Sequence, residues 1–339
     1  MHDTVGTRKT IPMVLLLLLD ILIAAHLVFA VYYIVYELPL AYPGDSTATK
    51  GIPVSRTLTQ TPSQTPRLIP LEEMTPASNW KTKFAGHFSS KIVSSDTSYS
   101  SPNLSVDITR HRMGSGNNTV TYYVADIYLA DISCFQTYFA HNTYGGRTQS
   151  LSDMSNEVGA ILAMNGDSYR FNLKHLNGLL MRNGTVYRTN PTTADICVLY
   201  KDGTMVTSSP NDFNAQQAID NGALQTWVFG PKLLDANGRA LKKFNTWNYI
   251  TKSHPRSAIG YYEPGHYCFV VVDGRKTGYS RGMQLPELAA VFENLGCTAA
   301  YNLDGGHTTF LTLRGTVVNR PYKPTKTITD CIYIREPAN

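Results

Sequence analysis

The sequence predicts an α+β domain, built from a mixed β-sheet with a few flanking helices and preceded by one transmembrane helix. Three observations lead to this expectation. Residues 11–36 are almost wholly apolar, residues 80–339 contain many short β-branched and aromatic runs, and one amphipathic helix has clear start and stop signals. A chain of 339 residues has room for an anchor and one domain, since single domains of mixed type reach about 250 residues.

The apolar segment 11–36 fits a membrane span, because about 20 apolar residues in a helix cross a bilayer core. Arg8 and Lys9 precede it, and the next basic residue is Lys50. The positive-inside rule then places residues 1–10 in the cytoplasm as a short tail and the remainder outside the cell. A cleaved signal peptide is the alternative, but its apolar core is only about 7–15 residues long and ends at an Ala-x-Ala-like site. We therefore expect an uncleaved, single-pass anchor in the lipid bilayer of the cell membrane.

Two ionisable residues, Asp20 and His26, lie inside this span. Such groups are costly in a bilayer and often contact a partner, so they could dock another membrane protein. Alternatively, the many apolar neighbours outweigh one protonated aspartate. Both readings stay open.

Residues 37–79 form a linker rich in Pro, Ser and Thr. This composition buries too little apolar surface to offset the entropy of ordering, and its prolines favour an extended chain. We expect a spacer that holds the domain at 80–339 away from the membrane.

The domain begins with short strands separated by turns. We expect strands at residues 119–129, 160–164, 257–262, 266–272, 298–303 and 308–313, and a short helix at 152–158. Asn183-Gly184 and Asp202-Gly203 are typical two-residue hairpin turns, and Arg314-Gly315 is a further turn. Alternation of strands with few helices favours the α+β class.

One helix is expected directly after Gln284. Pro286 suits the first helical turn, and Gly296 suits the C-terminal cap. Between them, apolar residues recur at the i, i+3, i+4 and i+7 spacing of one buried face: Leu288, Val291, Phe292 and Leu295.

Charge and cysteine content exclude some classes of protein. The net charge is +5, charged residues make up 16% of the chain, and the basic residues are scattered, so we expect no nucleic-acid partner. The five cysteines show no C-x-x-C spacing, which argues against a structural zinc site. Outside the cell some could pair, and their connectivity stays open.

Polar residues follow two of the expected buried strands in the same manner. Asn165-Gly166-Asp167 comes after residues 160–164, and Asn302 to His307 (Asn-Leu-Asp-Gly-Gly-His) comes after 298–300. Glycine lets a ligand approach the backbone, and neighbouring carboxylates and amides can do acid–base work or bind sugar hydroxyls. Ordinary turn chemistry explains either motif alone, but the doubled arrangement favours a site.

Two arginines stand beside further strand ends. Arg256 leads into residues 257–262, and Asp273-Gly274-Arg275 ends residues 266–272. The planar guanidinium suits phosphate, although each could equally form a surface ion pair. Gly278 to Gly282 matches G-x-S-x-G around Ser280, but no strand directly precedes the serine, so a nucleophile elbow is not expected.

Taken in order, these motifs resemble the phosphodiester glycosidase domain, whose bacterial members are often described as exopolysaccharide biosynthesis proteins. The resemblance covers about residues 80–334. Two positions depart from the family: Asp167 stands where a second glycine is frequent, and His307 stands where small residues are usual. These departures bear on the sugar more than on the reaction. The matching motifs are Ala163 to Asp167, Gly178 to Arg188, Phe229 to Pro231, His254 to Gly260, Val272 to Arg275 with Gly278 to Ser280, and Asn302 to Gly306.

The resemblance implies an extracytoplasmic hydrolase that cleaves sugar-1-phosphodiester bonds in surface or exopolysaccharide material. It implies Asp304 as base or nucleophile, Asp167 and Asp273 as further catalytic carboxylates, and Arg256 and Arg275 as the phosphate clamp. The remaining implied substrate-binding residues are Asn165, Gly166, Ser280, Asn302, Gly305, Gly306 and His307. Of these, Asn165 and Asn302 either bind sugar hydroxyls or orient the aspartates.

Three alternatives remain open from the sequence. No cofactor or metal is expected, but the oxygens of the two Asn/Asp motifs could hold a hard divalent cation such as calcium. The domain could be a non-catalytic, tethered binder of anionic glycans in polysaccharide assembly. It could also be a subunit of a membrane complex that docks through Asp20 and His26.

Overall fold

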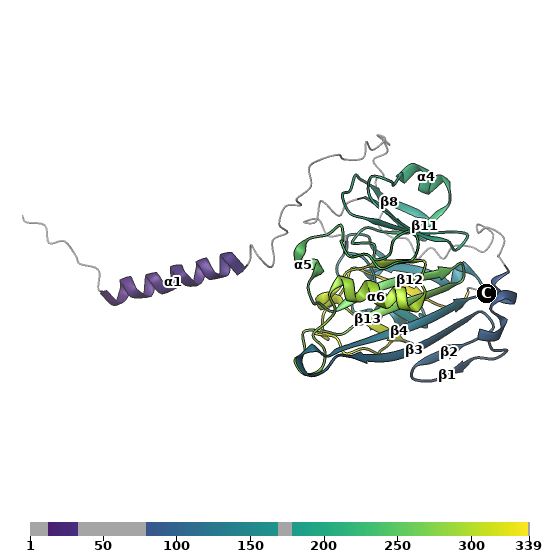
Figure 1. Ribbon diagram of the computed structural model, residues 1–339, viewed down its shortest axis with the longest axis horizontal. Helices are drawn as coiled ribbons and strands as arrows, with labels where there is room; N and C mark the ends of the chain where they lie inside the picture. Colours follow the sequence, from purple (N-terminus) through teal and green to yellow (C-terminus); the bar gives the residue numbers. More distant parts are fainter. Residues whose placement is uncertain (1–12, 33–78, 169–177, 338–339) are drawn as a thin grey trace, which may run out of the picture. The chain divides into compact units, whose positions relative to one another are not determined.

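The computed structural model describes residues 13–32, 79–168 and 178–337 (Figure 1). The chain divides into two compact units, Met1–Gly44 and Asp45–Asn339. The predicted cytoplasmic tail lies outside the described residues, as does nearly all of the predicted linker.

The first unit contains the helix α1 (Met13–Tyr32). Its side chains at positions 19–31 are exposed, including Asp20 and His26, and Nδ1 of His26 lies 2.9 Å from the carbonyl oxygen of Leu22. Within the described residues, no helix combines the length and the apolar character needed to cross a membrane. The anchor over residues 11–36 therefore remains a prediction, and so does a membrane partner at Asp20 and His26.

The larger sheet of the second unit has seven strands in the order β1-β2-β3-β4-β13-β12-β14. In β3, Leu104, Val106 and Ile108 are buried while the residues between them reach solvent, which is the alternation of a strand with one covered face. The strands are β1 (Val93–Ser94), β2 (Ser98–Ser100), β3 (Leu104–Met113), β4 (Val120–Leu129), β12 (Arg256–Glu263), β13 (His266–Val272) and β14 (Ala299–Asn302).

The second sheet has five strands in the order β16-β15-β6-β17-β5. Every residue of β5, β6 and β17 is buried, so the centre of this sheet is covered on both faces. The strands are β5 (Phe135–Phe139), β6 (Leu162–Asn165), β15 (Leu311–Leu313), β16 (Thr316–Val317) and β17 (Asp330–Ile334).

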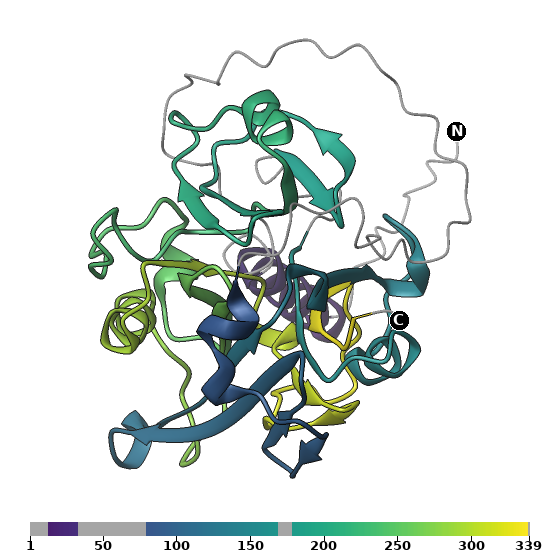
Figure 2. The same cartoon turned by 90° about the vertical axis from the view of Figure 1, so that its right-hand side faces the viewer.

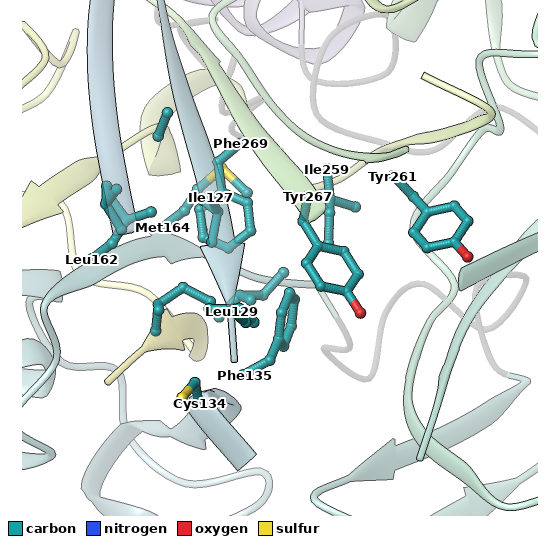
Figure 3. Close-up of a cluster of buried hydrophobic side chains, with 14 of the residues drawn as sticks. Ile127, Leu129, Cys134, Phe135, Leu162, Met164, Ile259, Tyr261, Tyr267 and Phe269 are labelled. Carbon is teal, nitrogen blue, oxygen red and sulfur yellow. The ribbon is translucent and has the colours of Figure 1, made fainter. Parts of the chain in front are cut away.

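The main hydrophobic core joins these two sheets (Figure 3). Ile127 and Phe269 of the larger sheet belong to the same buried cluster as Leu162 and Met164 of β6. Burying a side chain of this size stabilises the folded state by about 1.5–3 kcal/mol. The core therefore fixes the end of β6 relative to the larger sheet, and the polar residues described below lie at that end.

Helices cover the outer faces of both sheets. In Figure 1, α6 (Leu285–Leu295) lies across β12 and β13, and its buried residues form a second cluster with Val270 and Val272. Gln284 and Glu287 form a capping box, and Gly296 ends the helix with φ 80°. On the second sheet, α3 (Leu151–Glu157) shares a cluster with residues of β6 and β17.

A smaller lobe, around α4 in Figures 1 and 2, is built from hairpins. The strands β7 and β8 pair with each other, and β10-β9-β11 form a three-stranded sheet. These strands share an apolar cluster of their own with α4. The bounds are β7 (Leu179–Arg182), β8 (Thr185–Thr189), β9 (Ile196–Tyr200), β10 (Met205–Ser208), β11 (Ala223–Trp227) and α4 (Ala215–Asp220).

The remaining helical segments are short. They are α2 (Trp80–Lys83), α5 (Asn248–Thr251) and the 3-10 turns η3 (Ala85–His87), η4 (Gly116–Asn118), η5 (Ile132–Cys134), η6 (Ala140–Asn142) and η8 (Gly306–Thr308).

The predicted α+β class, rich in strands with a few helices, is confirmed. The predicted mixed sheet is corrected: among the described strand pairs, all four sheets are antiparallel. Many successive strands are joined by short turns, and such turns can connect only antiparallel neighbours. All five cysteines are buried and unpaired, and Sγ of Cys268 lies 3.7 Å from Sγ of Cys297.

Candidate active site

Asn165 is the residue through which the two sheets meet at the candidate site. It ends β6 and is buried. Its Nδ2 donates to the carbonyl oxygen of Asp304 (2.7 Å), and its Oδ1 accepts from Ser257 Oγ (2.6 Å) and from the N–H of Phe310 (3.2 Å). The amide therefore ties the loop after β14 to the end of β6. If Asn165 contacts a sugar hydroxyl directly, as one of the two predictions has it, one of these hydrogen bonds has to break.

Asp167 lies two residues further on and is also buried. Its Oδ1 accepts from the N–H of Ser168 (3.0 Å), and its Oδ2 accepts from the N–H of Val228 (2.8 Å). Burial raises the pKa of Asp167, and the nearby Arg182 opposes that rise. The carboxyl thus connects the end of β6 to the smaller lobe.

A buried ion pair holds the segment that contains Gly166 and Asp167 in place. Nε and NH2 of Arg182 both donate to Oδ2 of Asp330, at 3.0 and 2.6 Å, and Oδ1 of Asp330 accepts from the N–H of Asp167 (2.8 Å). Burial raises the pKa of Asp330 to about 6, against the lowering effect of Arg182. A Cβ on Gly166 would lie 2.6 Å from Asp330 Oδ1, so only glycine fits there.

Sequence reasoning did not select Arg182 or Asp330 as site residues. Arg182 lies within the matching motif Gly178 to Arg188 and directly follows three apolar residues. A charged residue in such a run could have indicated a buried, paired charge. Asp330 carries no comparable signal, because its partner is 148 residues away in the chain.

Asp304 is the carboxylate of the site that reaches solvent. It is partly exposed, and its Oδ1 accepts from the N–H of Gly305 (2.8 Å). Desolvation raises the pKa of Asp304 to about 6; bonds from Thr308 and Gly305 and the charge of Lys326 oppose the rise, whereas the charge of Asp167 adds to it. A carboxylate with this pKa is a stronger base than an ordinary aspartate.

The two glycines after Asp304 let the loop lie flat against the segment before β12. A Cβ on Gly305 would lie 2.7 Å from the carbonyl oxygen of Pro255. Gly306 has φ 67°, and its N–H donates to the same oxygen (3.0 Å). The loop geometry therefore requires glycine at position 305 for space and favours it at 306 for conformation.

Arg275 lies beside this loop and is partly exposed. Its backbone is in the left-handed region, with φ 57°. Its NH1 is 3.1 Å from Nε2 of His307, and its NH2 is 3.2 Å from both Tyr249 Oη and Nδ1 of His254. Among the described residues, no carboxylate forms an ion pair with this guanidinium. Its hydrogen-bond partners among the described residues are two histidine rings and a tyrosine hydroxyl.

Aromatic rings surround the same guanidinium. Burial lowers the pKa of His254 to about 4, so this imidazole is neutral at pH 7. Its Nε2 lies 2.8 Å from the carbonyl oxygen of Tyr249, which assigns the proton to Nε2 and leaves Nδ1 to accept from Arg275. His307 stacks on Tyr322, with ring centroids 5.4 Å apart, and Arg275 lies 5.6 Å from the Tyr322 ring. His254, Tyr249 and Tyr322 were not predicted as site residues.

Arg256 differs from the predicted phosphate clamp. It is buried, its Nε donates to the carbonyl oxygen of Met283 (3.0 Å), and its NH2 donates to those of Ile250 and Lys252. Burial lowers the pKa of Arg256 to about 9. Through these hydrogen bonds Arg256 fixes the segment before β12. Of the two predicted clamp residues, only Arg275 therefore reaches solvent.

Asp273 and Ser280 are likewise buried and hydrogen-bonded within the protein. Asp273 accepts from Asn319 Nδ2 (2.9 Å), from the N–H of Arg320 (3.0 Å) and from Tyr279 Oη (2.7 Å). Ser280 Oγ accepts from the N–H of Thr121 (3.0 Å) and donates to the carbonyl oxygen of Asp273. Both residues hold the turn that carries Arg275, instead of facing the site as predicted.

Asn302 completes the predicted set. Its Nδ2 donates to the carbonyl oxygen of Gly230 (2.7 Å), and no donor among the described residues reaches its buried Oδ1. The described part of the chain also holds no group of three His, Cys, Asp or Glu side chains close enough for a metal ion. The side-chain oxygen of Asn165 and both carboxylate oxygens of Asp167 accept hydrogen bonds within the protein.

The SPbeta prophage-derived uncharacterized protein YomE of Bacillus subtilis (strain 168) is 28% identical over 184 residues, which is 52% of this chain and 28% of that protein. This chain thus spans less than a third of the length of that relative. The catalytic domain of zebrafish N-acetylglucosamine-1-phosphodiester alpha-N-acetylglucosaminidase, auto-inhibited by its pro-peptide, matches with a TM-score of 0.57 at 19% identity. That match covers 77% of this chain and 94% of the zebrafish chain, so the two share a fold.

A family model for phosphodiester glycosidases matches residues 158–335. The matched segment contains both sides of the site, from Asn165 and Arg182 to Arg275, Asp304 and Asp330. Because the match covers more than half of the 339 residues, this chain belongs to the phosphodiester glycosidase family.

Proposed function

We propose that this chain hydrolyses sugar-1-phosphodiesters by breaking the bond between the sugar C1 and the phosphate oxygen. One observation carries the proposal: Asp304, a partly exposed carboxylate of raised pKa, directly precedes the Gly305-Gly306 turn, and the guanidinium of Arg275, which has no ion-paired carboxylate among the described residues, lies against the same turn. The turn brings a base and a phosphate-binding group to one surface, and this reaction needs both.

Asp304 acts as the base. Its pKa of about 6 leaves it ionised at neutral pH, yet basic enough to take a proton from an attacking water. The water oxygen forms a bond to C1 as the C1–O bond to phosphate breaks, and that bonding pair stays on the phosphate oxygen. The proton passes from water to Asp304 and then to solvent.

The leaving phosphate monoester is a stable anion, so protonation of its oxygen by the protein is a minor requirement. The greater need is to bind its charge and to stabilise an oxocarbenium-like sugar in the transition state. Arg275 binds the phosphate, since its planar guanidinium suits bidentate contact and no carboxylate among the described residues forms an ion pair with it. Gly306 lies in van der Waals reach of this guanidinium, because a Cβ there would be 3.4 Å from Arg275 NH2.

The buried residues hold these two groups in place. Asn165 fixes the backbone of Asp304, while Asp330 and Arg182 fix the segment that contains Gly166 and Asp167. Such support matters because a reacting group displaced by about 1 Å can lose roughly 100-fold in rate.

The proposal includes the location of the domain. The apolar segment 11–36, with Arg8 and Lys9 before it, supports a single-pass anchor with a cytoplasmic N-terminus and an extracellular catalytic domain. Surface or exopolysaccharide material is then the accessible source of glycosyl phosphates.

The test uses the full chain purified in detergent. It is incubated with a panel of methyl sugar-1-phosphodiesters and, separately, with p-nitrophenyl glycosides, and released sugar is followed by mass spectrometry. We expect release from the phosphodiesters only. Asp304→Asn should abolish it, whereas the control Asp220→Asn, at an exposed position of α4, should not. Equal release by wild type and Asp304→Asn would contradict the proposed base. No release from any phosphodiester by a folded chain that binds them would favour the non-catalytic glycan binder.

A further inference from the structure

A groove separate from Asp304 opens between the larger sheet and the β15–β16 turn. Its volume is about 710 Å3. Ile108 and Tyr123 of the larger sheet form part of its lining, and Leu313, Arg314 and Val318 contribute from the other side. We call this feature, together with its rim of Arg110 and Arg314, the basic groove.

The groove has an apolar floor and a cationic rim. Ile108, Tyr123 and Leu313 are buried, whereas Arg110 and Arg314 are exposed. Arg314 is held at the rim because its NH1 donates to Ser94 Oγ (2.9 Å) and its NH2 donates to the carbonyl oxygen of Ser95 (3.1 Å). An apolar floor with fixed cations above it suits a ligand that has both a carbon skeleton and negative charge.

Further cations continue from the rim toward the candidate active site. The ring of Tyr279 lies between them: Arg110 is 5.8 Å from its centroid, and Arg320 is 4.9 Å from it. Lys276 Nζ donates to the carbonyl oxygen of Arg320 (3.2 Å), and Lys276 directly follows Arg275. The cations therefore follow one another from the basic groove to Lys276, the residue next to the proposed phosphate-binding Arg275 in the chain.

This row carries an excess of positive charge. In the described parts of the chain, none of the side chains of Arg110, Arg314, Arg320 and Lys276 forms an ion pair with a carboxylate. Asp96 is the acidic residue among those that line the groove. Desolvation, followed by the charge of Arg320, lowers the pKa of Lys276, and the charge of the buried Asp273 opposes that effect. Like charges held this close favour a bound anion.

We propose that the basic groove binds the following sugar-phosphate units of a polymeric substrate, a glycan whose sugars are joined by phosphodiester bonds. This inference rests on the proposed function and adds the substrate class: a chain whose cleaved phosphodiester lies at Arg275 and whose next phosphates lie along Lys276, Arg320 and Arg110. The apolar floor receives the sugar faces between phosphates.

The test compares two substrates built from one repeat, a single methyl sugar-1-phosphodiester and a six-repeat oligomer. The full chain in detergent should give a kcat/KM per cleavable bond about tenfold higher for the oligomer, since several charge contacts of modest strength add along the groove. The double variant Arg110→Gln/Arg314→Gln should lose this advantage. The matched control Arg239→Gln should keep it, because Arg239 is an exposed arginine paired with Glu293 of α6.

A binding measurement separates this inference from the proposed function. A fluorescent six-repeat oligomer is titrated into full-length Asp304→Asn, with and without the two groove substitutions. Binding that is about tenfold weaker in the groove variant supports the inference. It does so even if the wild-type chain hydrolyses neither substrate, because absence of hydrolysis would refute only the proposed function. Hydrolysis of both substrates at equal kcat/KM, with binding unchanged by the groove substitutions, would overturn the inference and leave the proposed function standing. Equally tight binding of a single-stranded DNA of the same charge would overturn the assignment to a glycan.

Discussion

The buried pair Arg182–Asp330 gives the most quantitative prediction. Both side chains are at most 2% exposed, and the two donated bonds are 3.0 and 2.6 Å long. Replacing Arg182 by Met keeps most of the apolar stem between Phe139 and Trp227, whose rings are both 5.9 Å from the guanidinium carbon. It leaves the Asp330 carboxylate buried without its cation, which typically costs about 3–5 kcal/mol of unfolding free energy.

The loss should depend on pH in a direction that the structure determines. The folded-state pKa of Asp330, about 6, lies above its ordinary value of 3.8, so the folded chain binds the extra proton and stability falls as pH rises from about 4 to 6. Removing Arg182 removes the main lowering influence, so the pKa in the variant is higher and stability continues to fall above pH 6. Each further pKa unit adds about 1.4 kcal/mol of loss at pH 8 compared with pH 5.

Urea unfolding of the full chain, followed by tryptophan fluorescence at pH 5 and pH 8, measures both effects. Arg182→Met should lose about 3–5 kcal/mol at pH 8 and less at pH 5, and adding Asp330→Asn should remove most of the difference between the two pH values. The exposed pair Arg239–Glu293, 3.4 Å apart, supplies the control, and Arg239→Met should cost under about 1 kcal/mol. A loss for Arg182→Met below about 1 kcal/mol, or one equal at both pH values, would refute this reasoning.

Four further predictions concern turnover. Asp304→Asn should lower kcat at least about 100-fold, and a melting curve at pH 8 should show no loss of stability, because ionising a carboxyl whose pKa is raised to about 6 costs folding energy. In wild type, kcat/KM should rise with pH through about 6 as Asp304 ionises; a flat profile from pH 4.5 to 7.5 would count against Asp304 as base. Arg275→Lys should raise KM for a phosphodiester about tenfold in steady-state assays, since the ammonium group of lysine cannot make the bidentate contact of a planar guanidinium. An unchanged KM would exclude phosphate binding at this position. Gly305→Ala should lower both kcat and the melting temperature, because its Cβ would lie 2.7 Å from the Pro255 oxygen, and wild-type values for both would show that the loop can move aside.

Local patterns were enough to predict much of the fold. The helix after Gln284 follows from Pro286, the apolar spacing and Gly296, all of which act within one segment. The Asn183-Gly184 turn is another example, because both residues have positive φ, 50° and 76°, as the hairpin requires. Strands β5 and β17 were not predicted, since every residue in them is buried and no alternation marks them.

The site was predicted less completely, for a physical reason. Sequence patterns selected Asp304 and Arg275, which stand at strand ends beside glycines, and both face the candidate site. The same patterns selected Arg256 and Asp273, but both are buried and bonded within the protein, to partners that include Met283 and Asn319, 27 and 46 residues away. Whether a charged residue faces solvent or braces a loop depends on tertiary contacts, which residue type and spacing do not contain.

The most direct test of the central claim is which bond is broken. The full chain is allowed to hydrolyse a methyl sugar-1-phosphodiester in water enriched in oxygen-18, and the phosphate monoester product is analysed by mass spectrometry. Attack on C1 leaves that monoester without label and puts the oxygen-18 in the sugar, and this is the result we predict. Label in the phosphate monoester would mean that water attacks phosphorus, and the proposed glycosidase mechanism at Asp304 would then be wrong.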